Sequence, residues 1–313
     1  MNNEKWAMRV RKGLFGIVLV LAAFAGCGRN QQAGSEQENY RSEIEDWQKT
    51  RLTNLKAPEG WVNLAGLFWL KEGRNTFGSD SSNDIVFPSA APAFIGIIEL
   101  QGDSVFLRST SVPVMIDSMP ADKMKLNDDT GNKPDVMKLN SLAWFIIKRG
   151  DQYGIRLRDY KNPALDSLTS IPAFEINEKW RISAEYKPYE RPVKYMVPTI
   201  IGIEEENIVP GELTFRLKGK KLTLYPFTSG DRFFIVFGDK TNGTETYPSG
   251  RFLYTNGPDA QNRVIIDFNK CYNPPCAFTP YATCPLPLRK NILPVRIEAG
   301  EKSVHLFKQH NAF

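Results

Sequence analysis

The chain has little of what common enzymes require. Among its 313 residues there are two histidines and four cysteines, so zinc sites and histidine-based triads have only His305 and His310 to draw on. The Gly-x-Ser-x-Gly elbow, the phosphate-binding loop, the dinucleotide fingerprint, Cys-x-x-Cys and His-Glu-x-x-His are all missing. We therefore expect no metal and no cofactor, and serine hydrolase chemistry is disfavoured.

The net charge of the chain is also small. The formal net charge is +5, and residues 1–26 contribute +3 of it through four basic residues and one acidic residue, which leaves +2 for the rest of the chain. So small a charge does not create the positive field that nucleic-acid binding needs. We expect no nucleic-acid partner.

No hydrophobic run reaches membrane-spanning length. The run at residues 13–25 follows a basic segment, and as a helix it would extend about 20 Å, against roughly 30 Å for a bilayer core. A signal peptide over residues 1–26 is the better interpretation.

The end of this run is Phe24-Ala25-Gly26-Cys27, which resembles the lipobox of bacterial lipoproteins. The resemblance implies cleavage before Cys27 and lipidation of that cysteine, which would anchor the protein to a membrane surface without a spanning helix. The location would then be the bacterial cell envelope outside the cytoplasm, periplasmic or at the outer membrane. An ordinary secreted protein, or a short membrane anchor in which Cys27 is incidental, remains the alternative.

What the sequence does contain favours β structure. Its 21 prolines, 23 glycines and 12% aromatic residues favour many short strands joined by turns. Apolar runs recur about every 8–15 residues without long helices between them, which indicates packed antiparallel sheets. Residues 213–217 and 222–225 flank a short glycine-containing loop and predict a hairpin, and Asn242-Gly243 suits a type I′ turn.

These patterns predict the following organisation. Residues 27–38 are small and polar and are expected to form a flexible tether. Residues 39–126 hold an N-terminal helix, which ends near residue 55, and a small β-sandwich. The polar stretch at 127–134 is predicted to be an exposed loop inside or between two β subdomains, and residues 135–313 form a larger antiparallel sheet. The fold class is mainly β.

The stretch from residue 233 to residue 301 has the most distinctive motifs. Asp267-Phe268-Asn269, Asn273–Phe278 and Cys284–Pro287, together with Gly60-Trp61, residues 64–70 and Gly154–Asp159, resemble the bacterial family called domain of unknown function 1684. The resemblance covers about residues 40–308 and implies no established reaction. Cys271 stands where the resemblance implies a small residue, so it receives no family role.

A second resemblance is shorter. Residues 76–88, followed by Gly96 and residues 105–107, look like the opening of a forkhead-associated β-sandwich. Ser79 stands in place of the phosphate-gripping arginine, and no Ser-x-x-His follows. The resemblance therefore implies the shape of a sandwich and not phosphopeptide binding.

The polar residues between 239 and 301 form the candidate site. If the strands bring them close together, the cost of desolvation should lead Arg251 to pair with a carboxylate. The leading hypothesis is a non-catalytic surface that binds a small ligand, a glycan or a peptide. Its candidate residues are Tyr247, Arg251, Asp267, Asn269, Asn273 and Glu301.

Two alternatives stay open for these residues. One is a hydrolase in which Asp239, Asp267 or Glu301 act as acid and base while Arg251 stabilises negative charge. The other is a structural polar network that fixes the loops between strands.

Cys276 and Cys284 enclose seven residues. In an oxidising periplasm this spacing suits a disulfide that closes the proline-rich loop. Relatives without an export signal would keep such thiols reduced, so the oxidation state is left open. A nucleophilic cysteine activated by His305 is a minor alternative.

Overall fold

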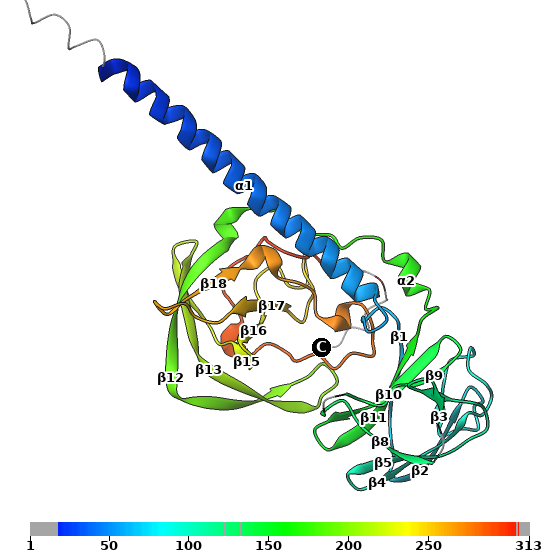
Figure 1. Cartoon of the computed structure of the whole chain (residues 1–313). Coiled ribbons are helices and arrows are strands. Elements are labelled where there is room, and N and C mark those ends of the chain that lie inside the picture. The colour runs from blue at the N-terminus through cyan, green and yellow to red at the C-terminus, as the bar shows by residue number, and fades with distance from the viewer. Residues whose placement is uncertain (1–17, 122, 132, 305, 307–313) are drawn as a thin grey trace, which may run out of the picture. The chain divides into compact units, whose positions relative to one another are not determined.

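The computed structural model describes residues 18–121, 123–131, 133–304 and 306 (Figure 1). Most of the predicted signal peptide, residues 1–17, lies outside the described residues, as do His305 and His310 and the side chain of Cys27. The chain divides into two compact units, Met1–Trp47 and Gln48–Phe313. Each unit is described by itself.

Helix α1 runs from Val18 to Lys56. It contains the helix predicted from residue 38 onward and ends just before Pro58, whose ring cannot continue a helix. It also covers residues 27–38, where the sequence predicts a flexible tether. Glutamine, glutamate and alanine in this stretch favour the helix and outweigh Gly28 and Gly34. None of the helices among the described residues is both long enough and apolar enough to span a bilayer.

The first β region is a sandwich of two sheets, built from residues 64–159. The six-stranded sheet has the order β1-β11-β10-β9-β6-β7 and the five-stranded sheet the order β3-β2-β4-β5-β8. One core fills the space between them, in which Phe77 and Phe87 pack edge-on against Trp144. The strands are β1 (Leu64–Trp69), β2 (Gly73–Gly78), β3 (Ile85–Val86), β4 (Gly96–Gln101), β5 (Ser104–Thr110), β6 (Met115–Ile116), β7 (Met119–Pro120), β8 (Met124–Leu126), β9 (Met137–Leu139), β10 (Leu142–Arg149) and β11 (Gln152–Asp159).

The polar stretch at residues 127–134 lies inside the first β region, so the division that the sequence predicts between residues 39–126 and 135–313 is wrong. Strands β9, β10 and β11 belong to the first sandwich, since their inward side chains, such as Ile146 and Leu157, share the core of Phe77. The polar loop connects strands within the sandwich, and Asp129 in it binds Arg149 on β10. The physical reason is that burial of the β10–β11 hairpin, and not the polarity of a loop, determines where a domain ends.

The second β region follows α2 (Ala164–Ser167) and a short 3₁₀ turn, η1 (Glu178–Trp180). Its four-stranded sheet has the order β14-β13-β12-β18, and its three-stranded sheet the order β15-β16-β17. Contacts of β13 with β15 and of β17 with β18 bring the two sheets around one core. The strands are β12 (Arg181–Pro198), β13 (Glu204–Leu217), β14 (Lys220–Leu224), β15 (Phe227–Ser229), β16 (Arg232–Phe237), β17 (Arg251–Asn256) and β18 (Arg263–Asp267).

Two predicted turns have different outcomes. Strands β13 and β14 form the predicted hairpin through Lys218 and Gly219, whose φ angles are +48° and +76°, the signs that a type I′ turn requires. The second prediction is wrong. At Asn242-Gly243 only the glycine has a positive φ, +77°, whereas a type I′ turn needs a positive φ at both residues; the Asn242 side chain instead donates to Thr246 and to the carbonyl of Tyr247. The mainly β, antiparallel class with an N-terminal helix is confirmed.

The side chains along β16 and β17 alternate between the two faces of their sheet. Phe233, Ile235 and Phe237 of β16 face the core between the sheets. Their neighbours Phe234 and Val236 face the opposite side of the sheet, where a second apolar cluster contains Cys284. Successive residues of a strand point to opposite faces, so the same strands present two different environments.

Candidate functional site

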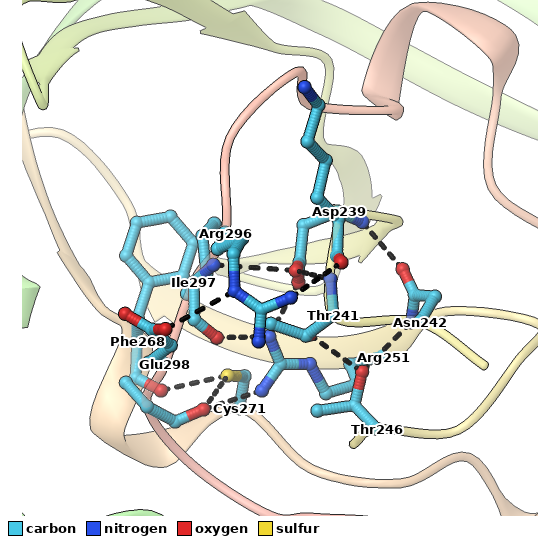
Figure 2. A network of polar contacts seen from close by, with 12 residues as sticks. Asp239, Thr241, Asn242, Thr246, Arg251, Phe268, Cys271, Arg296, Ile297 and Glu298 are labelled. Atoms are coloured by element: carbon cyan, nitrogen blue, oxygen red, sulfur yellow. Dashed lines mark hydrogen bonds and ion pairs between the residues drawn. The ribbon is translucent and has the colours of Figure 1, made fainter. Parts of the chain in front are cut away.

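Arg251, the first residue of β17, lies on the core side of the sheet and forms a fully buried ion pair with Asp239 (Figure 2). Its Nη2 donates to Asp239 Oδ2 at 2.6 Å and to the carbonyl of Ile297 at 2.9 Å, and Nη1 donates to the carbonyl of Ala299. The other carboxylate oxygen of Asp239 accepts from the backbone N–H of Thr241 at 2.7 Å. This cluster, with Asn242 and Thr246, is called the Arg251 network below.

The Arg251 network joins loops in the interior of the protein. Both side chains of its ion pair are 0% exposed. Around it Asn242 donates to Thr246, whose hydroxyl also lies 2.8 Å from that of Thr241. Arg251 Nε has no partner among the described residues. A buried pair of this kind is costly to break because the remaining charge is left without compensation.

Asp267 and Asn269 form a second polar group. The carboxylate of Asp267 accepts from the backbone N–H of Asn269 at 3.1 Å and caps the 3₁₀ turn η2 (Phe268–Lys270). The amide of Asn269 exchanges two hydrogen bonds with the backbone of Asn177, 3.1 and 2.9 Å long. These two side chains therefore fasten the segment before β12 to the end of β18.

Glu301 and Asn273 form a third group around Arg51 of α1. Glu301 accepts from Arg51 Nε at 3.3 Å and from the backbone N–H of Asn273 at 2.7 Å. Arg51 Nη2 also donates to the carbonyl of Asn273 at 3.0 Å. Burial raises the pKa of Glu301, and the positive charge of Arg51 opposes this rise.

The structure thus distributes the sequence-predicted residues over three polar groups instead of one cavity. Tyr247 is buried as well and donates its hydroxyl to the carbonyl of Cys276 at 3.2 Å. Each group links segments far apart in sequence. This geometry matches the structural alternative for Asp239 and Arg251, because a ligand has no access to their ion pair.

A pocket of about 350 Å³ lies on the other face of β16 and β17. Its walls are largely aromatic. Phe234 of β16 stacks on Tyr254 of β17, with ring centroids 4.8 Å apart, and meets Phe252 edge-on at 4.9 Å. The lining residues are Arg51, Trp61, Phe234, Phe252, Tyr254, Tyr272, Pro275, Thr283, Cys284 and Pro285; they are called the aromatic pocket.

Arginines stack on three of the rings in the pocket. The guanidinium of Arg51 lies 4.4 Å from the centroid of Tyr272, and that of Arg232 lies 4.6 Å from the centroid of Tyr254. Arg156 of β11 lies 5.4 Å from the ring of Trp61. Cations over ring faces are favourable in themselves, and they make the surroundings of the pocket positive.

The sequence reasoning missed this pocket. It placed the site on polar residues, whereas only Arg51 is charged among the described residues that line the pocket. A usable signal was the alternation of β16 and β17, because the apolar face that carries Phe234 and Tyr254 leaves large side chains partly exposed.

The cysteines of the proline-rich loop lie next to each other at the edge of the pocket. Cys271, Cys276 and Cys284 are free cysteines in the structure, and a disulfide between Cys276 and Cys284 in an oxidising compartment stays a prediction. The backbone N–H of Cys276 donates to Cys284 Sγ at 3.2 Å. The thiol of Cys284 lowers the pKa of Cys276 through a hydrogen bond, and burial raises the pKa of Cys284.

The comparisons with known proteins agree with the late motifs. Residues 166–302 match the family model described as "Protein of unknown function (DUF1684)". This match supports the DUF1684 family for that part of the chain. No curated protein matches the chain.

Three solved structures are similar to parts of the chain. An uncharacterized protein from gene locus rrnAC0354 of Haloarcula marismortui is 25% identical over 44% of this chain and 78% of its own length, with a TM-score of 0.38. The FhaA FHA domain in complex with the intracellular domain of Rv3910 is 17% identical over 29% of this chain and 97% of its own, with a TM-score of 0.20. A structure from a study of phosphothreonine-dependent FHA domain interactions has the same identity and TM-score over 29% of this chain and 92% of its own.

The DUF1684 segment contributes most of the aromatic pocket. Phe252, Tyr272 and Cys284 come from it, and Pro275 and Pro285 belong to its two proline motifs. Trp61, from the Gly-Trp motif before the first sandwich, joins them from outside the matched residues. Three of the motifs that carry the sequence resemblance therefore contribute to this pocket, namely Gly60-Trp61, Asn273–Phe278 and Cys284–Pro287.

Proposed function

We propose that this chain is a lipid-anchored protein of the bacterial cell envelope that binds a glycan in the aromatic pocket. The observation that carries the proposal is the pocket itself, which combines about 350 Å³ of space with five aromatic side chains. Ligand pockets are usually of this size or larger, mainly apolar, and contain a few polar groups that orient the ligand.

Sugar rings suit these walls. The C–H face of a pyranose packs on aromatic side chains, and five of them line the aromatic pocket, of which Trp61, Tyr254 and Tyr272 also carry a polar group. The rings of Phe234, Phe252 and Tyr254 hold one another through stacked and edge-on contacts, so the walls are formed before a ligand arrives. This preorganisation reduces the entropy lost on binding.

The binding proposal is tested with a neutral sugar. We expect N,N′-diacetylchitobiose to bind the purified full chain in isothermal titration calorimetry, and Trp61→Ala to weaken binding at least tenfold. Trp69→Ala is the matched control, because Trp69 is also half-buried but does not line the pocket. Equal heats for both variants, or no binding by the unchanged chain, would reject the proposal.

The anchor part of the proposal rests on the sequence alone. Cells grown with labelled palmitate should label the chain, and Cys27→Ser should abolish the label. An unlabelled parent chain would reject lipidation.

The hydrolase alternative has less support. Asp239 and Arg251 are closed off from solvent, and a hydrolase needs its acid and base within reach of the substrate and of water. Mass spectrometry of the sugar after prolonged incubation distinguishes the two functions, since cleavage products would favour the hydrolase.

A further inference from the structure

Next to the aromatic pocket lies a cluster of three arginines, Arg149, Arg156 and Arg158, of which Arg156 is buried without a paired carboxylate. Arg156 is 3% exposed, and burial lowers its pKa to about 10, helped by the charge of Arg149. Among the described residues no carboxylate comes within 4 Å of Arg156, and its Nε finds no acceptor there either. A buried guanidinium without a counter-charge carries a large desolvation cost.

The neighbouring carboxylates are engaged by the other arginine. Asp129 accepts two hydrogen bonds from Arg149, 3.0 and 2.8 Å long, and Glu205 lies 3.5 Å from Arg149 Nε. Within the described part of the chain, Arg158, also in this cluster, donates to the neutral oxygens of Gly60 and Asn63 and to no carboxylate. Among the described residues, the carboxylates that form ion pairs in this cluster contact Arg149, and Glu59 acts on Arg158 through its charge, so Arg156 is left with a charge that no ion pair neutralises.

Thr283 connects this cluster to the pocket. Its hydroxyl oxygen accepts from Arg149 Nε at 3.2 Å and from Arg156 Nη2 at 3.4 Å. A hydroxyl has two acceptor lone pairs and one proton to donate, and the two arginines use both lone pairs. The structure offers the O–H of Thr283 no acceptor among the described residues, and Thr283 lines the pocket.

We propose that the glycan of the aromatic pocket is acidic, a pyranose bearing a carboxylate that accepts the hydrogen bond of Thr283 under the influence of Arg149 and Arg156. This inference rests on the proposed glycan binding and narrows its ligand class. The ring would lie among Trp61 and the tyrosines while the carboxylate supplies the counter-charge that Arg156 lacks. Charge-assisted hydrogen bonds of this kind are about twice as strong as neutral ones.

The positive surroundings of the pocket act in the same direction. Arg51 and Arg232 lie over Tyr272 and Tyr254, and no carboxylate belongs to the pocket lining among the described residues. Glu301, which pairs with Arg51, compensates only that one charge. A cationic ligand would meet like charges from several sides, which costs free energy.

A matched pair of disaccharides tests the proposal. N-acetylglucosaminyl-N-acetylmuramic acid differs from N,N′-diacetylchitobiose by a lactyl group that carries a carboxylate. We expect the acidic sugar to bind the full chain at least tenfold more tightly in calorimetry, and this advantage to shrink as salt is added. Equal affinities would overturn the acidic-ligand inference and leave glycan binding standing, whereas no binding of either sugar would reject glycan binding itself.

Variants of Thr283 locate the effect. Thr283→Val removes the hydroxyl at nearly constant shape and should abolish the preference for the acidic sugar, measured as the ratio of the affinities of the variant for the two sugars. Thr283→Ser keeps the hydroxyl and should keep the preference, which separates the hydrogen bond from a folding defect. Thr228→Val, on the exposed side of β15, is the control substitution. A preference that persists in Thr283→Val would overturn the role of this hydroxyl.

Discussion

The two faces of strand β17 show how differently one segment can use its residues. Arg251 points into the core and is held by Asp239 and backbone carbonyls without any exposed surface. Phe252 and Tyr254 point the other way, and Tyr254 stays 38% exposed at the aromatic pocket. The charged residue serves the fold, and the aromatic residues offer the surface. A charged residue in the sequence is therefore a poor guide to a binding site, because its oppositely charged partner can be buried together with it.

The largest expected effect is on the buried face. Arg251→Met should lower the free energy of unfolding by about 3–5 kcal/mol, because Asp239 would remain as an uncompensated buried charge. The measurement is urea unfolding followed by circular dichroism. Arg263→Met is the control, since its pair with Asp259 is 57% and 43% exposed and exposed pairs contribute about 0–1 kcal/mol. Similar losses in the two variants would contradict the contrast between the faces.

The pocket face should respond in binding instead of stability. Tyr254→Ser removes a stacked ring, so the affinity for N,N′-diacetylchitobiose should fall about tenfold, which corresponds to about 1.4 kcal/mol. Unfolding should change little because Tyr254 is partly exposed. Tyr160→Ser is the matched control, with the same 38% exposure outside the pocket. If Tyr160→Ser reduced binding equally, the aromatic pocket would not be the binding site.

A pH experiment sharpens the comparison at Glu301. Its pKa in the folded protein is raised above the ordinary value of 4.5, so the folded state holds a proton that the unfolded chain has lost. The contribution of Glu301 to stability is therefore fully present below pH 4.5 and is lost as the pH rises through the folded pKa, by at most about 1.4 kcal/mol per pH unit. Unfolding curves at several pH values should show this fall in the parent chain and not in Glu301→Gln.

Glu298 is a control because its pKa is shifted in the opposite direction. Hydrogen bonds from Arg296 and Lys218 lower its pKa below 4.5, so its contribution is present above pH 4.5 and is lost as the pH falls through the lowered value. Glu298→Gln should remove that loss on the acidic side. A shift of the profile in the same direction by both variants would contradict the opposite pKa shifts of Glu301 and Glu298.

The smallest effect concerns the cysteines. Cys276 is half-buried with a lowered pKa, whereas burial raises the pKa of Cys271 to about 12. Because the thiolate is the reactive form, iodoacetamide near neutral pH should modify Cys276 before Cys271, as read by peptide mass spectrometry over time. Faster modification of Cys271 would mean that the core around the Arg251 network opens more readily than the pocket edge.

The sequence is a good guide to local structure. The hairpin at Lys218-Gly219 follows from two residues of positive φ between alternating strands. Desolvation predicts the pairing of Arg251 with a carboxylate, and Asp239 is that carboxylate. The domain to which the hairpin after residues 127–134 belongs could not be predicted. The sequence of the polar loop is the same whether that hairpin packs on the preceding strands, as it does, or on the strands that follow.

The sequence by itself therefore determined the mainly β class, the motifs between residues 233 and 301 and the signal-like N-terminus, since these depend on local patterns of apolar, turn-forming and small residues. Only the tertiary structure decided which face each residue of β17 meets, and that Thr283 meets Arg149 and Arg156, which are 134 and 127 residues away in the chain. Contacts of this kind depend on how the sheets pack over a common core. A period of two in the sequence predicts that side chains alternate between the two faces of a strand, but it does not predict which segments pack against each face.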